Sequence, residues 1–191
     1  MFLRDKIKNK DNSSQTKNLF KILKIEETFS STRTNQDLLL FKTNPNIISF
    51  SKESNPKQIS KILSHHSLPP SKDIKHLVSV ELSPHPSSIY SFQNWRFDIF
   101  IPLDFPYSPP KVRIRNKIYH PNISESGAVC LNILGLDWSA ILTLEDVVIG
   151  ILDVLIEPNP NDPLNFDAGK LYTENYGKFL EKIKLDIGLK Y

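Results

Sequence analysis

Residues 95–116, WRFDIFIPLDFPYSPPKVRIRN, decide the fold class because they hold two strand patterns joined by a proline-rich segment. Alternation of apolar residues places them on one face of a strand, since side chains in a strand point to opposite faces in turn. The proline-rich segment between the runs lacks the amide hydrogens that a ladder needs, so we expect a turn there. The apolar positions of like parity are Trp95, Phe97, Ile99 and Ile101 in the first run, and Val112 and Ile114 in the second.

Two further strand patterns precede this pair. Residues 77–82 (LVSVEL) and the shorter run 47–51 (IISFS) are rich in β-branched and aromatic residues. Short, proline-bearing connections favour antiparallel neighbours, because parallel strands need long crossovers. The sequence therefore predicts a four-stranded antiparallel meander.

Helical patterns flank the predicted sheet. Residues from Ser14 to about Glu27 fit one amphipathic helix, with Ser13 or Ser14 as its N-cap. The apolar cluster 38–41 is either a second helix or the end of the first, and the pattern does not separate the two. The residues that define the first apolar face are Leu19, Phe20, Ile22 and Leu23.

The C-terminal third is also predicted to be helical. Thr143 and Asp146 resemble a capping box, and the apolar run 147–156 is typical of a buried helix. Helices after a meander and an irregular loop give the class α+β. A last helix is indicated by the spacing of Tyr176, Phe179, Leu180, Ile183 and Ile187.

Residues 52–75 are rich in Ser, Lys and Pro, and we interpret them as an inserted loop with one helical turn near Gln58–Leu63. His65 and His66 are adjacent there. A metal site needs further ligands at suitable spacing, and none is nearby. We therefore predict two solvated side chains and no metal site.

Composition limits the function classes. A net charge of +3 is too small to indicate a nucleic-acid partner, and no apolar run reaches the roughly 20 residues that span a membrane. A single cysteine excludes an internal disulfide, and charges appear too early in the chain for a signal peptide. We expect a reducing compartment, the cytoplasm or the nucleus.

The N-terminal segment is basic. Residues 1–24 contain seven Lys or Arg against two Asp. Such a run is either a solvated tail or a docking arm for an acidic groove, in which case Met1, Phe2 and Leu3 are its apolar anchors. We interpret residues 1–13 as a flexible arm and residues 14–191 as the core domain, with the insertion at about 52–75.

Cys130 lies in HPNISESGAVCLNILGLDW, residues 120–138. Its apolar neighbours are typical of a buried filler, whereas a nucleophile needs an accessible thiolate. His120 is the one nearby imidazole, but it precedes a proline ten residues away. The pattern does not favour a Cys-His hydrolase.

The motifs around this cysteine resemble those of the ubiquitin-conjugating enzymes. They are FPYSPPKVRI, YHPNI, GAVCLNIL, DWSAILTL and EPNPNDPLN, in that order over about residues 77–190. Within the family the chain looks most like the neddylation branch, which conjugates the Nedd/Rub-type modifier. The wording VCLNIL..DW, the closing EPNPNDPLN and a basic arm starting Met-Phe favour that branch.

The resemblance implies an acyl transferase with the ubiquitin-conjugating fold. Cys130 corresponds to the thiol that accepts the modifier's C-terminus from an activating enzyme, as a thioester. Asn122 corresponds to the HPN asparagine, which either donates to the oxyanion or holds its loop. Asp162 corresponds to the acidic residue that orients the incoming lysine and helps remove its proton, or alternatively caps a turn. His120 is expected to be structural, and Asn159 to brace Asp162.

Partner surfaces follow from the same resemblance. Tyr107 corresponds to a contact with RING-type ligases, cullin-associated ones among them, and Ser139, Ala140 and Ile141 form the second contact loop. Many family members have proline where this chain has Ala140. We expect no bound cofactor, because ATP is consumed by the activating enzyme. Two alternatives stay open: the same chemistry with ubiquitin itself, and a non-catalytic binding module of the same fold.

Overall fold

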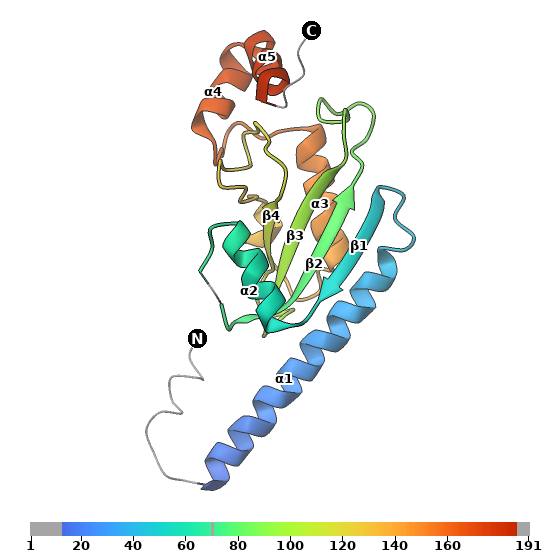
Figure 1. Cartoon of the computed structure of the whole chain (residues 1–191), viewed down its shortest axis with the longest axis vertical. Coiled ribbons are helices and arrows are strands. Elements are labelled where there is room, and N and C mark those ends of the chain that lie inside the picture. Colours follow the sequence, from blue (N-terminus) through green and yellow to red (C-terminus); the bar gives the residue numbers. More distant parts are fainter. Residues whose placement is uncertain (1–12, 70, 187–191) are drawn as a thin grey trace.

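The four predicted strands form one antiparallel sheet in chain order, β1-β2-β3-β4, as the meander predicts. The computed structural model describes residues 13–69 and 71–186 (Figure 1). The strands are β1 (Ile47–Glu53), β2 (Ile74–Leu82), β3 (Trp95–Pro102) and β4 (Lys111–Ile114).

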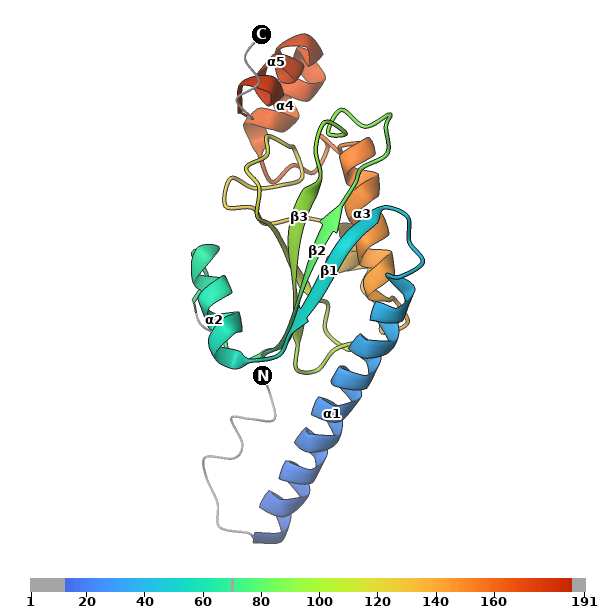
Figure 2. The ribbon, with the colours of Figure 1, turned by 45° about the vertical axis from the view of Figure 1, so that its right-hand side comes forward.

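Helices cover both faces of this sheet. In Figure 2, α3 lies behind one face, α2 stands off the other, and α4 and α5 sit beyond the strand ends. The predicted α+β class is confirmed. The helices are α1 (Ser13–Leu40), α2 (Pro56–His65), α3 (Leu144–Ile156), α4 (Phe166–Glu174) and α5 (Tyr176–Asp186), with a 3₁₀ turn η2 (Asn132–Leu134).

The core lies between the sheet and α3. The alternating residues of β3 pair across to β4, with Phe97 opposite Ile114 and Ile99 opposite Val112. All four side chains are buried, and Val148 and Ile151 of α3 belong to the same apolar cluster. The face predicted from alternation is therefore the one that packs.

The α3 helix begins at the predicted capping box. Thr143 Oγ1 accepts a hydrogen bond from the Asp146 amide at 3.1 Å, and Asp146 Oδ2 accepts one from the Thr143 amide at 2.7 Å. These bonds satisfy amides that a helix start leaves unpaired. Among the described residues, no helix is long and apolar enough to cross a membrane.

The N-terminal helix is one continuous element. The cluster 38–41, which the sequence left open, comprises the last three residues of α1 and the residue after it, and Leu38 and Phe41 are buried. The predicted N-terminal face is described in part: Ile22 is 46% exposed. Residues 1–12, with Met1, Phe2 and Leu3, lie outside the described residues, while Ser13 already belongs to α1.

The interpretation of residues 52–75 as a loop is wrong, although the helical turn predicted near Gln58–Leu63 lies within a longer helix. The two ends of the segment 52–75 belong to β1 and β2, and its centre forms α2. Pro56 occupies the first turn, where its missing amide costs nothing, and Asn55 caps the helix through a bond from the Lys57 amide. The helix packs Ile59 and Leu63 against Leu77 and Phe100 of the outer sheet face. Within α2, the solvent side of the amphipathic helix carries the exposed residues Pro56, Lys57, Lys61 and Ser64.

The prediction that both histidines are solvated is wrong for His66. His65 is exposed, but the His66 side chain is 8% exposed and its Nε2 lies 2.8 Å from Asp98 Oδ2. Asp98 is fully buried and also accepts hydrogen bonds from Arg115 and Ser79. A buried carboxylate needs such partners, and α2 supplies one of them.

We expect Asp98→Asn to lower the free energy of unfolding by about 1–3 kcal/mol at pH 7. Burial alone raises the pKa of Asp98, but hydrogen bonds from Arg115, His66 and Ser79 outweigh it and lower the pKa. This contribution is present above the unfolded pKa of about 3.9 and is lost as the pH falls through the folded pKa. Urea unfolding at pH 7 and near pH 3 measures the difference. Exposed Asp137→Asn is the control, and equal losses at both pH values would contradict the charge argument.

Candidate active site

The backbone around Cys130 is held against the edge of the sheet. The Ile114 amide donates to Gly127 O at 2.9 Å, and the Val129 amide donates to Val112 O at 3.2 Å. Gly127 has φ +81°, and a Cβ there would come within 2.8 Å of Ile114 O. Glycine is therefore required at this turn. The Cys130 amide then donates to Asn122 O at 3.0 Å, which ties the thiol to the HPN segment.

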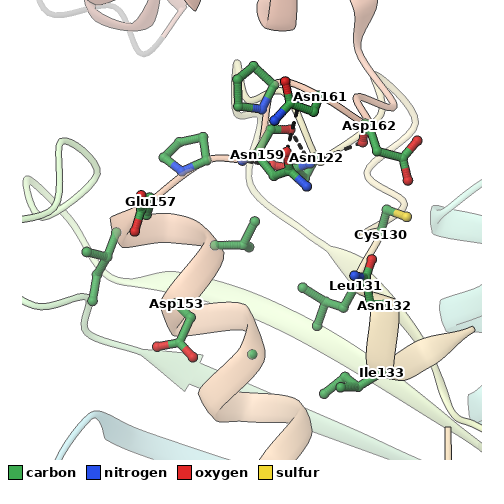
Figure 3. Close-up of a pocket in the computed structure, with 15 residues that line it drawn as sticks. Asn122, Cys130, Leu131, Asn132, Ile133, Asp153, Glu157, Asn159, Asn161 and Asp162 are labelled. Atoms are coloured by element: carbon green, nitrogen blue, oxygen red, sulfur yellow. Dashed lines mark hydrogen bonds between the residues drawn. The ribbon is translucent and has the colours of Figure 1, made fainter. Parts of the chain in front are cut away.

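The Asn122 side chain joins that segment to the loop after α3 (Figure 3). Its Nδ2 donates to Asn159 O at 2.8 Å and to Asp162 O at 3.3 Å, and its Oδ1 accepts from the Asn159 amide at 2.8 Å. Asn122 is 4% exposed. Both amide hydrogens are thus engaged in holding the loop that carries Asp162.

Both ring nitrogens of His120 are occupied. Its Nδ1 accepts from the Asn122 amide at 2.9 Å, so Nε2 carries the proton and donates to Val154 O at 2.9 Å. The ring is fully buried, and this burial lowers the pKa of His120 to about 4. His120 is therefore neutral at pH 7 and has no lone pair to offer as a base at Cys130.

The thiol and the Asp162 carboxylate lie on the same side of an open cleft. In Figure 3 both side chains point the same way, with Asp162 above Cys130. Cys130 is half-buried, and Asp162 and Asn159 are exposed. Burial first, and the Asp162 charge second, raise the pKa of the Cys130 thiol. The thiol is therefore mostly protonated at neutral pH.

The cleft itself measures about 720 Å³ and runs between η2 and α3. Its rim is acidic, with exposed Asp153 on α3 and exposed Glu157 at the C-cap of that helix. Gly150 is where α3 approaches this wall most closely, because a Cβ there would lie 3.2 Å from Ile133 Cδ1. The fold thus brings the three predicted catalytic residues, Cys130, Asn122 and Asp162, together on one cleft.

The predicted partner residues that the structure describes lie outside the lining of this cleft, on two loops beside α1: Tyr107, Ser139, Ala140 and Ile141. Tyr107 is 69% exposed and Ile141 is 82% exposed. Ser139 is exposed and Ala140 is half-buried. The two loops are joined because the Trp138 indole donates to Pro106 O at 2.8 Å.

Sequence reasoning missed the α1 residues at this surface. Phe29 is 50% exposed and stacks with Tyr107 at 6.4 Å between ring centroids. Arg33 and Asp37 form an ion pair at 2.8 Å, in which Arg33 contacts the second loop and Asp37 contacts the first turn of α3. The spacing of Arg33 and Asp37, four residues apart on a helix, is a signal that could have predicted their ion pair but not their contacts with the loop and α3.

The family model described as ubiquitin-conjugating enzyme matches residues 48–187. The chain belongs to the ubiquitin-conjugating enzyme family. This match spans the sheet, the Cys130 segment, α3 and the loop of Asp162, which are the parts that build the cleft. The predicted family resemblance and fold are confirmed.

Curated relatives of this chain include three NEDD8-conjugating enzymes named Ubc12. The chain is 36% identical over 151 residues to that of Dictyostelium discoideum, 38% over 133 residues to that of Yarrowia lipolytica, and 42% over 118 residues to that of Saccharomyces cerevisiae. The alignments cover 75%, 66% and 61% of this chain, and 66%, 74% and 63% of the relatives. The chain thus spans about two thirds of their length.

Solved structures show the same likeness. The S. cerevisiae Ubc12 structure matches with a TM-score of 0.68 at 31% identity, over 90% of each chain. An E2 domain of a Toxoplasma gondii ubiquitin-conjugating enzyme matches with a TM-score of 0.62 at 28% identity, over 81% of this chain and 94% of that one. The predicted similarity to the neddylation branch is confirmed by these names.

Proposed function

We propose that this chain accepts a NEDD8-type modifier as a thioester on Cys130 and transfers it to a substrate lysine. The observation that carries the proposal is the cleft, where the chain's single thiol, Asp162 and a loop braced by Asn122 converge. The similarity to three NEDD8-conjugating enzymes supports the choice of modifier.

The first step is a thioester exchange. The Cys130 sulfur attacks the carbonyl carbon of the thioester that joins the modifier to its activating enzyme. A new C–S bond forms, and the activating enzyme's thiol leaves with the proton that Cys130 has lost. The exchange conserves one thioester, so it needs no ATP at this site and no metal. The raised pKa of Cys130 makes deprotonation the demanding part of this step.

The second step is attack by an amine. A lysine side chain has a pKa near 10.4, so it reaches the cleft as an ammonium and must lose a proton to react. The exposed Asp162 carboxylate attracts the ammonium and accepts hydrogen bonds from it beside the sulfur. The acidic rim of Asp153 and Glu157 favours the same cationic substrate. The first proton passes through the Asp162 carboxylate to solvent. The neutral amine then attacks the thioester carbonyl carbon, the C–S bond breaks as the amide bond forms, and the Cys130 thiolate takes the second proton from the nitrogen.

A RING-type ligase is the proposed partner of the second step. Phe29, Tyr107 and Ile141 present exposed apolar side chains from α1 and the two loops beside it. Exposed aromatic and apolar residues that cluster on rigid loops are typical of protein docking sites. A cullin-bound RING subunit fits the similarity to the NEDD8-conjugating relatives.

Ubiquitin is the second candidate modifier. Two Xenopus laevis proteins named ubiquitin-conjugating enzyme E2 S are 38% and 36% identical to this chain over 110 and 118 residues. The cleft chemistry is the same for both modifiers. The modifier must therefore be decided by the activating enzyme that charges Cys130.

The proposal is tested by charging Cys130 with each modifier in the presence of that modifier's own activating enzyme. The chain is incubated with ATP and either NEDD8 or ubiquitin, each with its own activating enzyme, and resolved on non-reducing gels. We expect an adduct with NEDD8 that dithiothreitol removes and that forms at least tenfold faster than any ubiquitin adduct. Faster charging by ubiquitin would select the second candidate. If neither modifier forms an adduct that dithiothreitol removes, the proposal fails and the non-catalytic binding module becomes the favoured alternative.

A further inference from the structure

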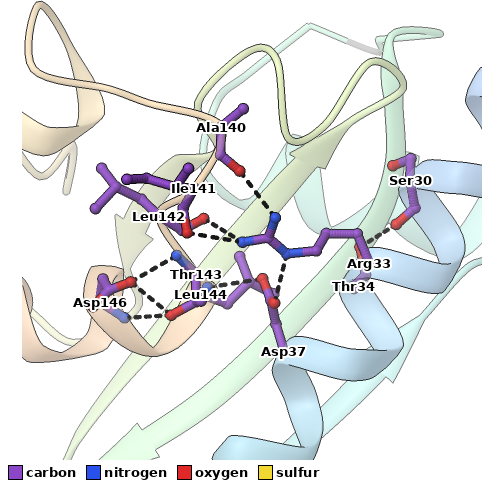
Figure 4. Close-up of polar contacts among 10 residues, drawn as sticks. All are labelled: Ser30, Arg33, Thr34, Asp37, Ala140, Ile141, Leu142, Thr143, Leu144 and Asp146. Carbon is purple, nitrogen blue, oxygen red and sulfur yellow. Dashed lines mark hydrogen bonds and ion pairs between the residues drawn. The ribbon is translucent and has the colours of Figure 1, made fainter.

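Arg33 of α1 binds the second partner loop through its backbone (Figure 4). Its guanidinium donates to the carbonyls of Ala140 at 2.9 Å, Ile141 at 3.3 Å and Leu142 at 2.7 Å. These are three consecutive carbonyls just before the capping box of α3. One side chain thus fixes the path of the loop that carries Ala140 and Ile141.

Asp37 holds this guanidinium in place and also anchors α3. Its Oδ1 accepts from Arg33 Nε at 2.8 Å, and its Oδ2 accepts from the Leu144 amide at 3.0 Å. The Leu144 amide belongs to the first turn of α3, where amides lack helical partners and a carboxylate is favoured. Arg33 is 18% exposed and Asp37 is 4% exposed, so water competes weakly for these bonds.

The same guanidinium reaches the first partner loop. It lies over the Phe105 ring at 5.9 Å, close enough for a cation–π contact. Phe105 in turn packs with Trp138 at 6.0 Å between ring centroids. Arg33 therefore sits where α1 meets both loops, one helical turn after Phe29, which stacks on Tyr107.

We propose that Arg33 is a positioning residue for the ligase-stimulated step, which it serves by ordering residues 140–142 before the ligase arrives. A loop that is already ordered spares the partner the cost of ordering it on binding. The fork of the guanidinium is suited to this task because it can donate to several carbonyls at once. Lysine, with a compact charge, cannot reproduce that geometry. This inference rests on the proposed function.

The test is Arg33→Lys, which keeps the charge and removes the fork. A cullin bound to its RING subunit serves as the ligase, and transfer from charged chain is followed over a range of ligase concentrations. We expect the half-saturating ligase concentration to rise about tenfold, or about 1.4 kcal/mol. Charging by the activating enzyme and ligase-free transfer to lysine should stay within twofold. Hydrogen exchange of amides 140–144 should become faster.

The matched control is Arg96→Lys, because Arg96 of β3 is an exposed arginine that pairs with Glu81 of β2 and, within the described part of the chain, makes no hydrogen bond or ion pair with either loop. An unchanged half-saturating concentration in Arg33→Lys would overturn the proposal. The proposal would also be overturned if Arg33→Lys slowed ligase-free transfer as much as ligase-stimulated transfer, because equal losses indicate a general loss of structure. If the wild-type chain is never charged, the proposed function fails, and this inference fails with it. If the chain is charged but Arg33→Lys does not weaken the ligase-stimulated step selectively, this inference fails and the proposed function stands.

Discussion

Replacing Cys130 with alanine is expected to reduce transfer of the modifier to lysine to the uncatalysed background. Cys130 is the chain's single cysteine, so no other thiol can carry the modifier. Serine should behave differently, because its hydroxyl can form an ester that the lysine attacks more slowly. We expect Cys130→Ser to give a modifier adduct that dithiothreitol does not remove. Non-reducing gels with and without dithiothreitol separate the two linkages.

The pH dependence of this thiol follows from its surroundings. Burial and the Asp162 charge raise the pKa of Cys130, so its thiolate fraction should still be increasing above pH 8.5, the usual value for a cysteine. Iodoacetamide alkylation between pH 6 and 10 measures this directly, and one cysteine leaves no background signal. A midpoint below 8.5 would contradict the proposed environment. Transfer that persists in Cys130→Ala would contradict the covalent route.

The sheet could be predicted from the sequence because its two faces differ. In β3 the residues of one parity are all apolar and all buried, so the period of two is plain in the sequence. The helix α2 was missed for a physical reason. Its buried side is narrow, with Ile59 and Leu63 as its buried residues, while Pro56 indicated a loop although it begins the helix. A short amphipathic helix on an outer sheet face has little apolar surface to reveal it.

The cleft was predicted through motif spacing, and the loop-anchoring residues were not. Cys130 and Asp162 lie far apart in sequence, yet their segments are joined because Asn122 bonds to both Asn159 and Asp162 backbone groups. The sequence around Arg33 carries a signal for its ion pair with Asp37 and none for its contacts with the loop. Three of its partners are backbone carbonyls, which every residue type carries. A side chain that binds backbone atoms imposes almost no pattern on the sequence of its partner loop.

Replacing Asn122 with alanine is expected to slow lysine transfer by about two orders of magnitude, the usual cost of a small misplacement or of one lost oxyanion donor. Because both amide hydrogens of Asn122 are engaged by the loop of Asp162, we expect the loss to come from release of that loop. Hydrogen exchange of amides 159–162 should then become faster. Asn161→Ala, an exposed neighbour, is the control and should leave both rates unchanged.

Alkylation of Cys130 separates the two roles of Asn122. Asp162→Asn removes a negative charge that raises the pKa of Cys130, so the thiolate fraction at pH 8 and the iodoacetamide rate should both increase. If Asn122 holds Asp162 beside the sulfur, Asn122→Ala should shift the alkylation rate in the same direction. If Asn122 acts as an oxyanion donor alone, transfer falls while alkylation and exchange of the loop stay at the wild-type rates. Thiol reactivity and lysine transfer, measured on the same charged and uncharged samples, therefore assign the role of Asn122.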